Sequence, residues 1–174
     1  VRGAALHFDM TVIASYIVAA DGRTTQLMVA ACDGNVTGGT TRFIDTTVAL
    51  EVIIASVLQF RQPGHAHTVT FNGVDVRGTS SVVFVMCIND ATFRTSRVDV
   101  ANVSVQVRTD RAVLFRGSFI DSVVGLANMA MQIVVASPAR SSETSIAIFP
   151  TIDSSSVALR NCNVNTTSSF TYLF

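Results

Sequence analysis

Hydrophobic and polar residues alternate in three segments of this chain that recur at one spacing. The segments are TVTFNGVDV (68–76), AVLFRGSFI (112–120) and SVALRNCNV (156–164), and each begins 44 residues after the previous one. In each segment the alternation is interrupted by Gly73, Gly117 or Asn161 and then resumes. Gly and Asn enter the left-handed backbone region at low cost, so their recurrence predicts a repeated corner between two strands.

Two other segments share part of this pattern and leave the repeat period open. QLMVAACDG (26–34) has Ala31 at the corner position, and RVDVANVSV (97–105) fits well but begins only 15 residues before the next copy. Repeats of roughly 20 to 50 residues are typical of solenoids, propellers and arrays, whose units bury their apolar faces against their neighbours. The pattern therefore predicts a repetitive all-β scaffold.

The spacing of apolar residues changes from two to three at the corner. Val69 and Phe71 precede Gly73, and Val74 and Val76 follow it. Side chains on both sides of a corner face one interior if the chain bends there, whereas a hairpin turn reverses the chain. We therefore expect a right-handed parallel β-helix, a pectin-lyase-like solenoid with rungs about 4.8 Å apart, in which 44 residues make two rungs. A β-sandwich is the alternative.

Composition favours one β domain. Val, Ile and Thr supply 56 of the 174 residues and Leu only eight, and β-branched residues suit a pleated surface. We expect residues 1–174 to form a single solenoid domain of a longer repeat protein, with 1–60 less regular and suited to a cap. The segment 48–60 has the length of a helix, which its β-branched content opposes. The polar segment 137–145 is expected to be a loop that leaves the coil.

Charge and hydropathy exclude two classes of partner. The chain has twelve cationic residues, all arginine, and twelve acidic residues, whereas nucleic-acid binding needs a basic excess. The longest apolar runs, 10–20 and 48–57, are shorter than the roughly 18 residues that cross a bilayer. We expect no membrane span here. Because the chain starts at Val1, a signal peptide or anchor is expected to lie outside it.

Histidine and cysteine supply few candidates for chemistry. His65 and His67 follow a Pro-Gly turn and would point to one face of a strand, as a metal site requires, but no third ligand is evident and a solvated turn is the favoured interpretation. Cys32, Cys87 and Cys162 form no Cys-x-x-Cys pair and are interpreted as buried thiols, with their disulfide state open. We expect no cofactor.

Parallel β-helices also carry polysaccharide lyases and glycosidases, which need clustered carboxylates, in some cases beside a basic residue. The candidates by position are Asp75, Asp121, Arg116 and Arg160, and the two arginines share one position of the repeat, so they would stack into a ladder. A ladder of exposed charges is more often a solvated face than a catalytic one. These residues are therefore candidates for binding, and no catalytic residue is assigned.

Three glycosylation sequons lie at Asn35, Asn102 and Asn165. They favour an exported, glycosylated protein, although in a chain this rich in Ser and Thr roughly two would occur by chance.

The motifs SVALRNCNV and AVLFRGSFI, in a lysine-free chain rich in Val, Ser and Thr, resemble the large surface proteins of kinetoplastid protists. The similarity is to the dispersed gene family type and related membrane-associated proteins, and it covers about residues 68–167. The resemblance implies a cell-surface β-helix with a distant membrane anchor and an adhesive role, and no catalytic residues. We therefore expect a non-enzymatic structural or adhesive segment that binds glycans or surface proteins, with a carbohydrate-active enzyme on the same scaffold as the alternative.

Overall fold

The chain forms a parallel β-solenoid. The computed structural model describes residues 6–13, 16–19, 26–135, 143–167 and 170–172, and within these ranges it contains strands and no helix. All eighteen described strands belong to one continuous sheet, and every pairing between them is parallel. The predicted β-helix is therefore confirmed, and the antiparallel β-sandwich is excluded for the described residues.

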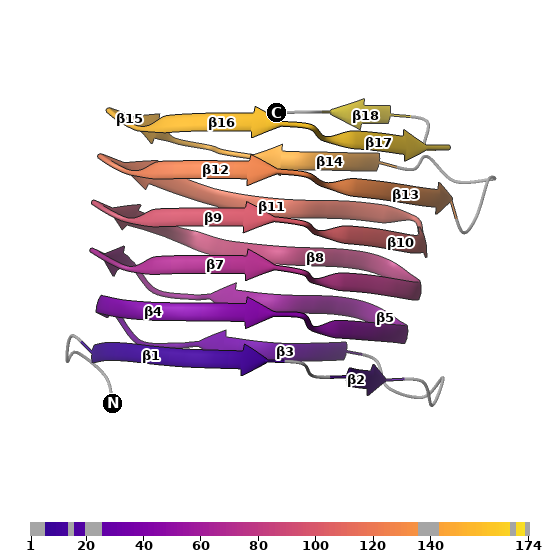
Figure 1. Ribbon diagram of the computed structural model, residues 1–174, viewed down its shortest axis with the longest axis horizontal. Helices are drawn as coiled ribbons and strands as arrows, with labels where there is room; N and C mark the ends of the chain where they lie inside the picture. The colour runs from indigo at the N-terminus through magenta and orange to yellow at the C-terminus, as the bar shows by residue number, and fades with distance from the viewer. Residues whose placement is uncertain (1–5, 14–15, 20–25, 136–142, 168–169, 173–174) are drawn as a thin grey trace.

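Successive coils stack their strands in three main columns (Figure 1). A short fourth ladder lies between the third column and the first, and it contains the start of β4, β6 (Gly64–His65), the ends of β8 and β11, and β15 (Ile152–Asp153). The first column contains β1 (Leu6–Ile13), β4 (Val36–Ile44), β7 (Thr68–Asn72), β9 (Arg97–Ala101), β12 (Val123–Ala127) and β16 (Ser156–Arg160). The second contains β2 (Tyr16–Ala19), the first halves of β5 (Thr47–Phe60) and β8 (Asp75–Arg94), β10 (Ser104–Thr109), β13 (Ala130–Val135) and β17 (Asn163–Thr166). The third contains β3 (Gln26–Cys32), the second halves of β5 and β8, β11 (Arg111–Ile120), β14 (Glu143–Ile148) and β18 (Phe170–Tyr172).

The coil is right-handed. In Figure 1 the first-column strands lie nearer the viewer and run to the right, the third-column strands lie behind and run to the left, and the chain climbs from its N-terminus to its C-terminus. This is the hand that parallel strand crossovers adopt almost without exception. The segment 48–60, whose length also suited a helix, lies entirely within β5 and is a strand.

The repeat period, which the sequence left open, is one coil of 26 to 33 residues, so the expectation that 44 residues make two rungs is wrong. Thr40, Thr68, Arg97, Val123 and Ser156 are successive partners in the first column, so the coils take 28, 29, 26 and 33 residues. Val69 and Val157 do lie in one column, three coils apart. A spacing of 44 residues is half of their separation in sequence and therefore does not correspond to a whole number of coils. AVLFRGSFI lies on β11, in the third column, whereas RVDVANVSV is a true copy in register with TVTFNGVDV.

The first corner joins the first and second columns and is the corner that the sequence pattern predicted. Its residues have left-handed backbone angles, with φ between 47° and 68°, at Asp45, Gly73, Asn102, Asn128 and Asn161. Asparagine amides form a ladder along it: Asn102 donates to Asn72 at 2.8 Å, Asn128 to Asn102 at 3.3 Å and Asn161 to Asn128 at 3.2 Å. Gly117, by contrast, is not at a corner but inside β11, where a Cβ would lie 2.8 Å from Ile88.

The second corner leads from the third column back to the first. It also has φ between 49° and 51°, at Ala66, Thr95, Asp121 and Ser154. A buried column of hydroxyls follows these residues: the backbone N–H of His67 donates to Ser96 Oγ at 3.2 Å, that of Ser96 to Ser122 Oγ at 3.0 Å, and that of Ser122 to Ser155 Oγ at 2.9 Å. Each hydroxyl thus satisfies a backbone donor of the previous coil.

The core consists of apolar residues that stack above one another from coil to coil. Phe43 and Phe71 stack with ring centroids 5.1 Å apart, and Phe60 and Phe93 pack edge to face at 4.9 Å. Buried phenylalanines of this kind stabilise neighbouring coils through area burial and ring contacts. The repeated coil therefore holds the outer side chains at fixed positions.

Candidate functional site

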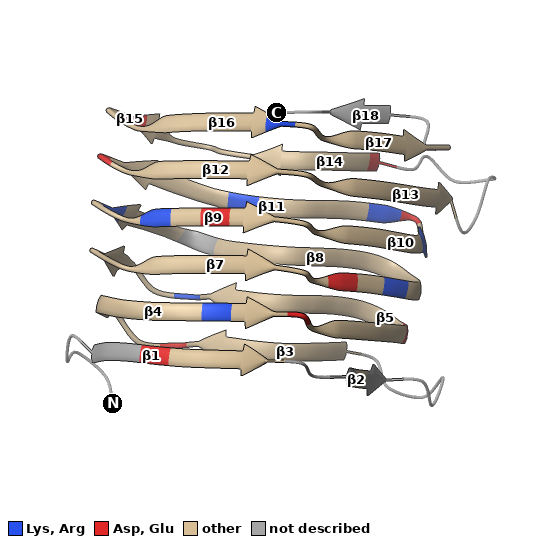
Figure 2. Ribbon diagram, in the orientation of Figure 1, with Lys and Arg blue, Asp and Glu red and all other residues tan. Residues whose placement is uncertain are grey.

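The four residues proposed as a binding or catalytic group do not converge. Arg116 lies on β11 beside Cys87 and Ile148, whereas Arg160 ends β16 beside Ala127, so the expected arginine ladder is wrong. Asp75 opens β8 in the second column, and Asp121 is exposed at the second corner. Figure 2 shows that the charged residues are scattered over the strands. The reason is register, because Arg116 and Arg160 match in sequence but occupy different columns.

A hollow of about 380 Å³ opens beside the second corner, on the outside of the solenoid. Its base is an outward-facing row of three residues in successive coils, since Thr37 pairs with His65 and His65 with Arg94. Strands in a sheet are about 4.8 Å apart, so this row extends over about 10 Å. The lining residues are Asn35, Val36, Thr37, Pro63, Gly64, His65, Ala91, Thr92 and Arg94. We call this feature the Arg94 hollow.

Two local features of the backbone shape the Arg94 hollow. Along β8, Cys87 pairs with Arg116 and Thr92 with Ser118, so four residues of β8 lie opposite one residue of β11 and form a bulge in the strand. Gly64 lies on the inner side, where a Cβ would be 2.6 Å from the Phe93 ring. Position 64 therefore needs a glycine, because the backbone just before His65 passes too close to the Phe93 ring for a side chain.

The Arg94 guanidinium in the Arg94 hollow has no acidic partner among the described residues. Within the described residues, neither the Arg94 guanidinium nor the exposed His65 imidazole has an ion-pair or hydrogen-bond partner. Asp121 and Asp153, on the two following coils, form no ion pair with Arg94. An exposed guanidinium beside an imidazole in a concave surface is suited to bind an anion.

Four other arginines of the described residues are neutralised by acidic neighbours. The pairs are Arg61 with Asp33 at 3.2 Å, Arg77 with Asp75 at 2.7 Å, Arg97 with Asp99, and Arg111 with Glu143 at 3.5 Å. The hydrogen bond from Arg97 to the Asp99 carboxylate, with its charge, raises the pKa of Arg97. These exposed pairs contribute little to stability, but they leave those surfaces locally neutral.

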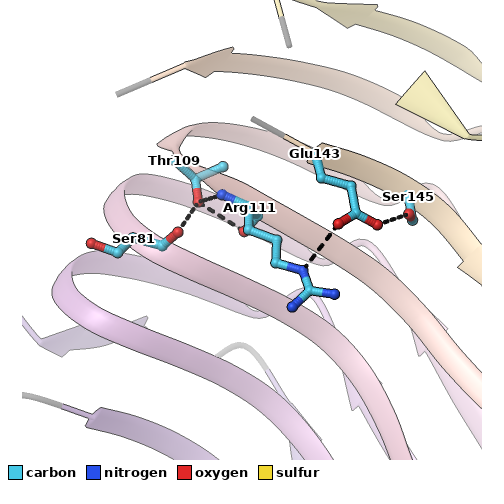
Figure 3. A network of polar contacts seen from close by, with 5 residues as sticks. All are labelled: Ser81, Thr109, Arg111, Glu143 and Ser145. Carbon is cyan, nitrogen blue, oxygen red and sulfur yellow. Dashed lines mark hydrogen bonds and ion pairs between the residues drawn. The ribbon is translucent and has the colours of Figure 1, made fainter. Parts of the chain in front are cut away.

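The Arg111–Glu143 pair belongs to a polar network at the start of β11 (Figure 3). Thr109 Oγ1 lies 3.1 Å from the Ser81 carbonyl oxygen and 2.9 Å from that of Arg111, and Ser145 Oγ donates to Glu143 at 3.4 Å. The network joins β11 to β14 and satisfies the backbone at the turn between the second and third columns. Its role is therefore structural.

The two histidines point in opposite directions. His65 is exposed, whereas His67 is fully buried, because the left-handed conformation of Ala66 between them breaks the strand alternation. His67 Nδ1 lies 2.8 Å from the Gly38 carbonyl oxygen and Nε2 lies 2.9 Å from Thr41 Oγ1, and the ring packs against Phe60. The proposed metal pair is therefore wrong, and so is a solvated turn for His67.

A second hollow, of about 370 Å³, lies on the outside of the second column. Gly78 forms part of its floor with φ of 129°, and a Cβ there would meet the Leu50 carbonyl oxygen at 2.0 Å. Its polar groups include the exposed side chains of Gln106 and Gln132, which are neighbours in register. This surface offers amide donors and acceptors.

The sequons differ in what surrounds them. Asn35 is exposed at the Arg94 hollow and Asn165 is exposed on β17. Asn102 is exposed too, but its amide nitrogen donates to Asn72 in the first-corner ladder. A glycan on Asn102 would use that nitrogen and weaken the ladder.

The cysteines form no disulfide. Cys32 and Cys87 are buried, which confirms their interpretation as core thiols, whereas Cys162 is only partly buried. Cys162 follows the first corner in the same position as Val74, whereas Cys32 ends β3 beside Phe60.

Comparisons with protein-family models, with curated proteins and with solved structures returned no match to this chain. In the part of the chain that the structure describes, no three His, Cys, Asp or Glu residues are grouped to hold a metal ion. No helix there is long and apolar enough to cross a membrane. The Arg94 hollow could not be found from sequence, because only the register brings residues 37, 65 and 94 together.

Proposed function

We propose that this solenoid is a non-enzymatic, adhesive segment of an extracellular or cell-surface protein, and that its outer face binds glycans or surface proteins. The observation that carries this proposal is a row of exposed polar side chains along the second column. Arg77, Gln106, Gln132 and Asn165 are partners in consecutive coils and all are exposed. Their spacing of about 4.8 Å repeats along the axis.

A rigid row of this kind suits a repetitive ligand. Amide and guanidinium groups donate hydrogen bonds to hydroxyl, carbonyl and carboxylate oxygens, and the amides also accept them. Because the coil fixes these groups in advance, little conformational entropy is lost when several bind along one polymer. The row can thus bind a glycan or an extended protein segment without chemical conversion.

The exported location rests on the two sequons whose amides are exposed and outside the ladder, at Asn35 and Asn165, and on the resemblance to kinetoplastid surface proteins. Neutral charge overall is consistent with a surface that binds through hydrogen bonds rather than through a strong electrostatic field.

The test is a binding assay of the immobilised chain against an array of oligosaccharides and against whole cells. We expect retention that the double variant Gln106→Ala/Gln132→Ala reduces severalfold. A matched control is Arg42→Ala/Thr70→Ala, which alters neighbouring residues of the first column. Equal loss in both variants, or no retention on any surface, would overturn the proposal. Cleavage of a bound polysaccharide would instead identify a carbohydrate-active enzyme.

A further inference from the structure

The Arg94 hollow differs from the polar row in both charge and shape. The row of Arg77, Gln106, Gln132 and Asn165 includes an arginine neutralised by Asp75. In the Arg94 hollow, by contrast, a guanidinium and an imidazole stand side by side without an acidic partner among the described residues. A guanidinium without an acidic partner, beside an imidazole that can donate a hydrogen bond, favours a compact anionic group over a neutral polymer in a concave site.

We propose that the Arg94 hollow binds one acidic sugar residue, whose carboxylate or sulfate lies against Arg94 and His65. This inference rests on the proposed adhesive function and assigns it a ligand class. Arg94 supplies a planar fork of donors that matches two oxygens of the anion. His65, its partner in the adjacent coil, donates to the same group from the side.

The remaining polar groups of the hollow suit a sugar ring. Asn35, Thr37 and Thr92 line it and offer an amide and two hydroxyls, which pair with ring hydroxyls as donors and acceptors. A volume of about 380 Å³ is enough for a single sugar residue and too small for a folded protein surface. A sugar acid thus fits both the charge and the size of the site.

The sequon at Asn35 places a condition on this site. Asn35 lines the hollow, so an N-linked glycan attached there would begin inside it and compete with any ligand. Protein for the test must therefore be produced in bacteria, which leaves Asn35 unmodified. Enzymatically glycosylated protein provides an internal comparison.

The experiment is calorimetric titration of the bacterially produced chain with three probes at fixed ionic strength. A hyaluronan hexasaccharide supplies carboxylates without sulfate, a carrageenan hexasaccharide supplies sulfates without carboxylate, and chitohexaose is neutral. We expect one or both acidic probes to bind and the neutral one not to bind. The acidic probe that binds identifies which anion the site takes.

Two variants locate the binding. Arg94→Gln removes the guanidinium and should weaken the affinity for the acidic probe by about tenfold. Arg94→Lys keeps the charge and should weaken this affinity less. The matched control is Arg160→Gln, which removes an exposed arginine that has no ion pair among the described residues and lies on β16. Because Arg94 is exposed, the circular dichroism spectrum and Tm of Arg94→Gln should match those of the unaltered chain.

The outcomes separate this inference from the proposed function. Equal weakening by Arg94→Gln and Arg160→Gln would show general electrostatic attraction and overturn the site, as would equal binding of the neutral probe. No binding of either acidic probe would also overturn it. None of these results would contradict the proposed function, provided that retention of cells or glycans still depends on Gln106 and Gln132. Tighter binding of polyglutamate than of both acidic sugars would point to an acidic protein ligand and contradict the assignment.

Discussion

At the scale of single residues, His67 is a structural residue whose role depends on two hydrogen bonds, one buried and one partly buried. A carbonyl oxygen only accepts, so Nδ1 carries the proton that points to Gly38, and a neutral ring then accepts at Nε2 from the Thr41 hydroxyl. Both Thr41 and His67 are fully buried. This side chain therefore adds two hydrogen bonds to the backbone pairing that joins the second corner to the preceding coil.

We predict that His67→Ala lowers the free energy of unfolding by about 3 kcal/mol, because it leaves a cavity and removes the partner of the buried Thr41 hydroxyl and of the partly buried Gly38 carbonyl group. His65→Ala, two residues away and exposed, should change it by less than about 0.5 kcal/mol. Equilibrium urea denaturation of both variants measures the difference. Similar losses in the two variants would mean that burial of His67 does not stabilise the corner.

The two histidines also show what local pattern cannot reveal. Alternation on a strand predicts that residues two apart share a face, and that argument is sound as long as the backbone stays extended. Ala66 does not stay extended, since its φ is 51°. Alanine carries no sequence signal for such a conformation, so neither the burial of His67 nor the separate exposure of His65 could be predicted.

At the scale of elements, the first corner combines backbone conformation with side-chain hydrogen bonding. Asn128 has φ of 52°, donates its amide to Asn102 and accepts from Asn161. Glycine tolerates the same φ but has no side-chain amide. Alanine is strained at this φ and has no side-chain amide either. Comparing Asn128→Gly with Asn128→Ala therefore separates the two contributions.

We predict that Asn128→Ala costs about 2 kcal/mol of unfolding free energy, from left-handed strain and the lost ladder bonds. Asn128→Gly should cost about half as much, because only the bonds are lost and because glycine is more flexible in the unfolded chain. Thermal and urea denaturation, with Asn165→Ala on the exposed face of β17 as a control, measure both. A glycine variant at least as unstable as the alanine variant would contradict the role of strain.

The two corners explain how far the sequence could predict this fold. Gly73 and Asn161 indicate the first corner in the sequence, because these residue types favour positive φ. The parallel coil could therefore be predicted from them, and this prediction is confirmed. The second corner holds Ala66, Thr95, Asp121 and Ser154 in the same conformation, where a buried hydroxyl column satisfies the backbone. Because the residue types of the second corner do not indicate positive φ, and because the coils differ in length, the register between coils could not be predicted from the sequence. The expected arginine ladder depended on that register and was therefore wrong.

At the scale of the whole molecule, each coil contacts only its neighbours, so stability is distributed along the axis. β9 pairs with β7 on one side and β12 on the other, whereas β16 pairs only with β12 among the described strands. The inward residues differ in the same way. Val98 and Val100 are buried on β9, and the equivalent Val157 and Leu159 on β16 are only partly buried.

We predict that, in the isolated 174-residue chain, amide hydrogen exchange is slow throughout β9 and much faster in β16, because β16 pairs on one side only and the apolar burial beneath it is incomplete. Exchange measured by mass spectrometry on peptides of 97–101 and 156–160 tests this. Equal protection at low protein concentration would contradict a solenoid that opens from this end. Protection of β16 that rises with concentration would instead show a second copy stacking on the exposed edge, because such an edge is open to pairing with another strand.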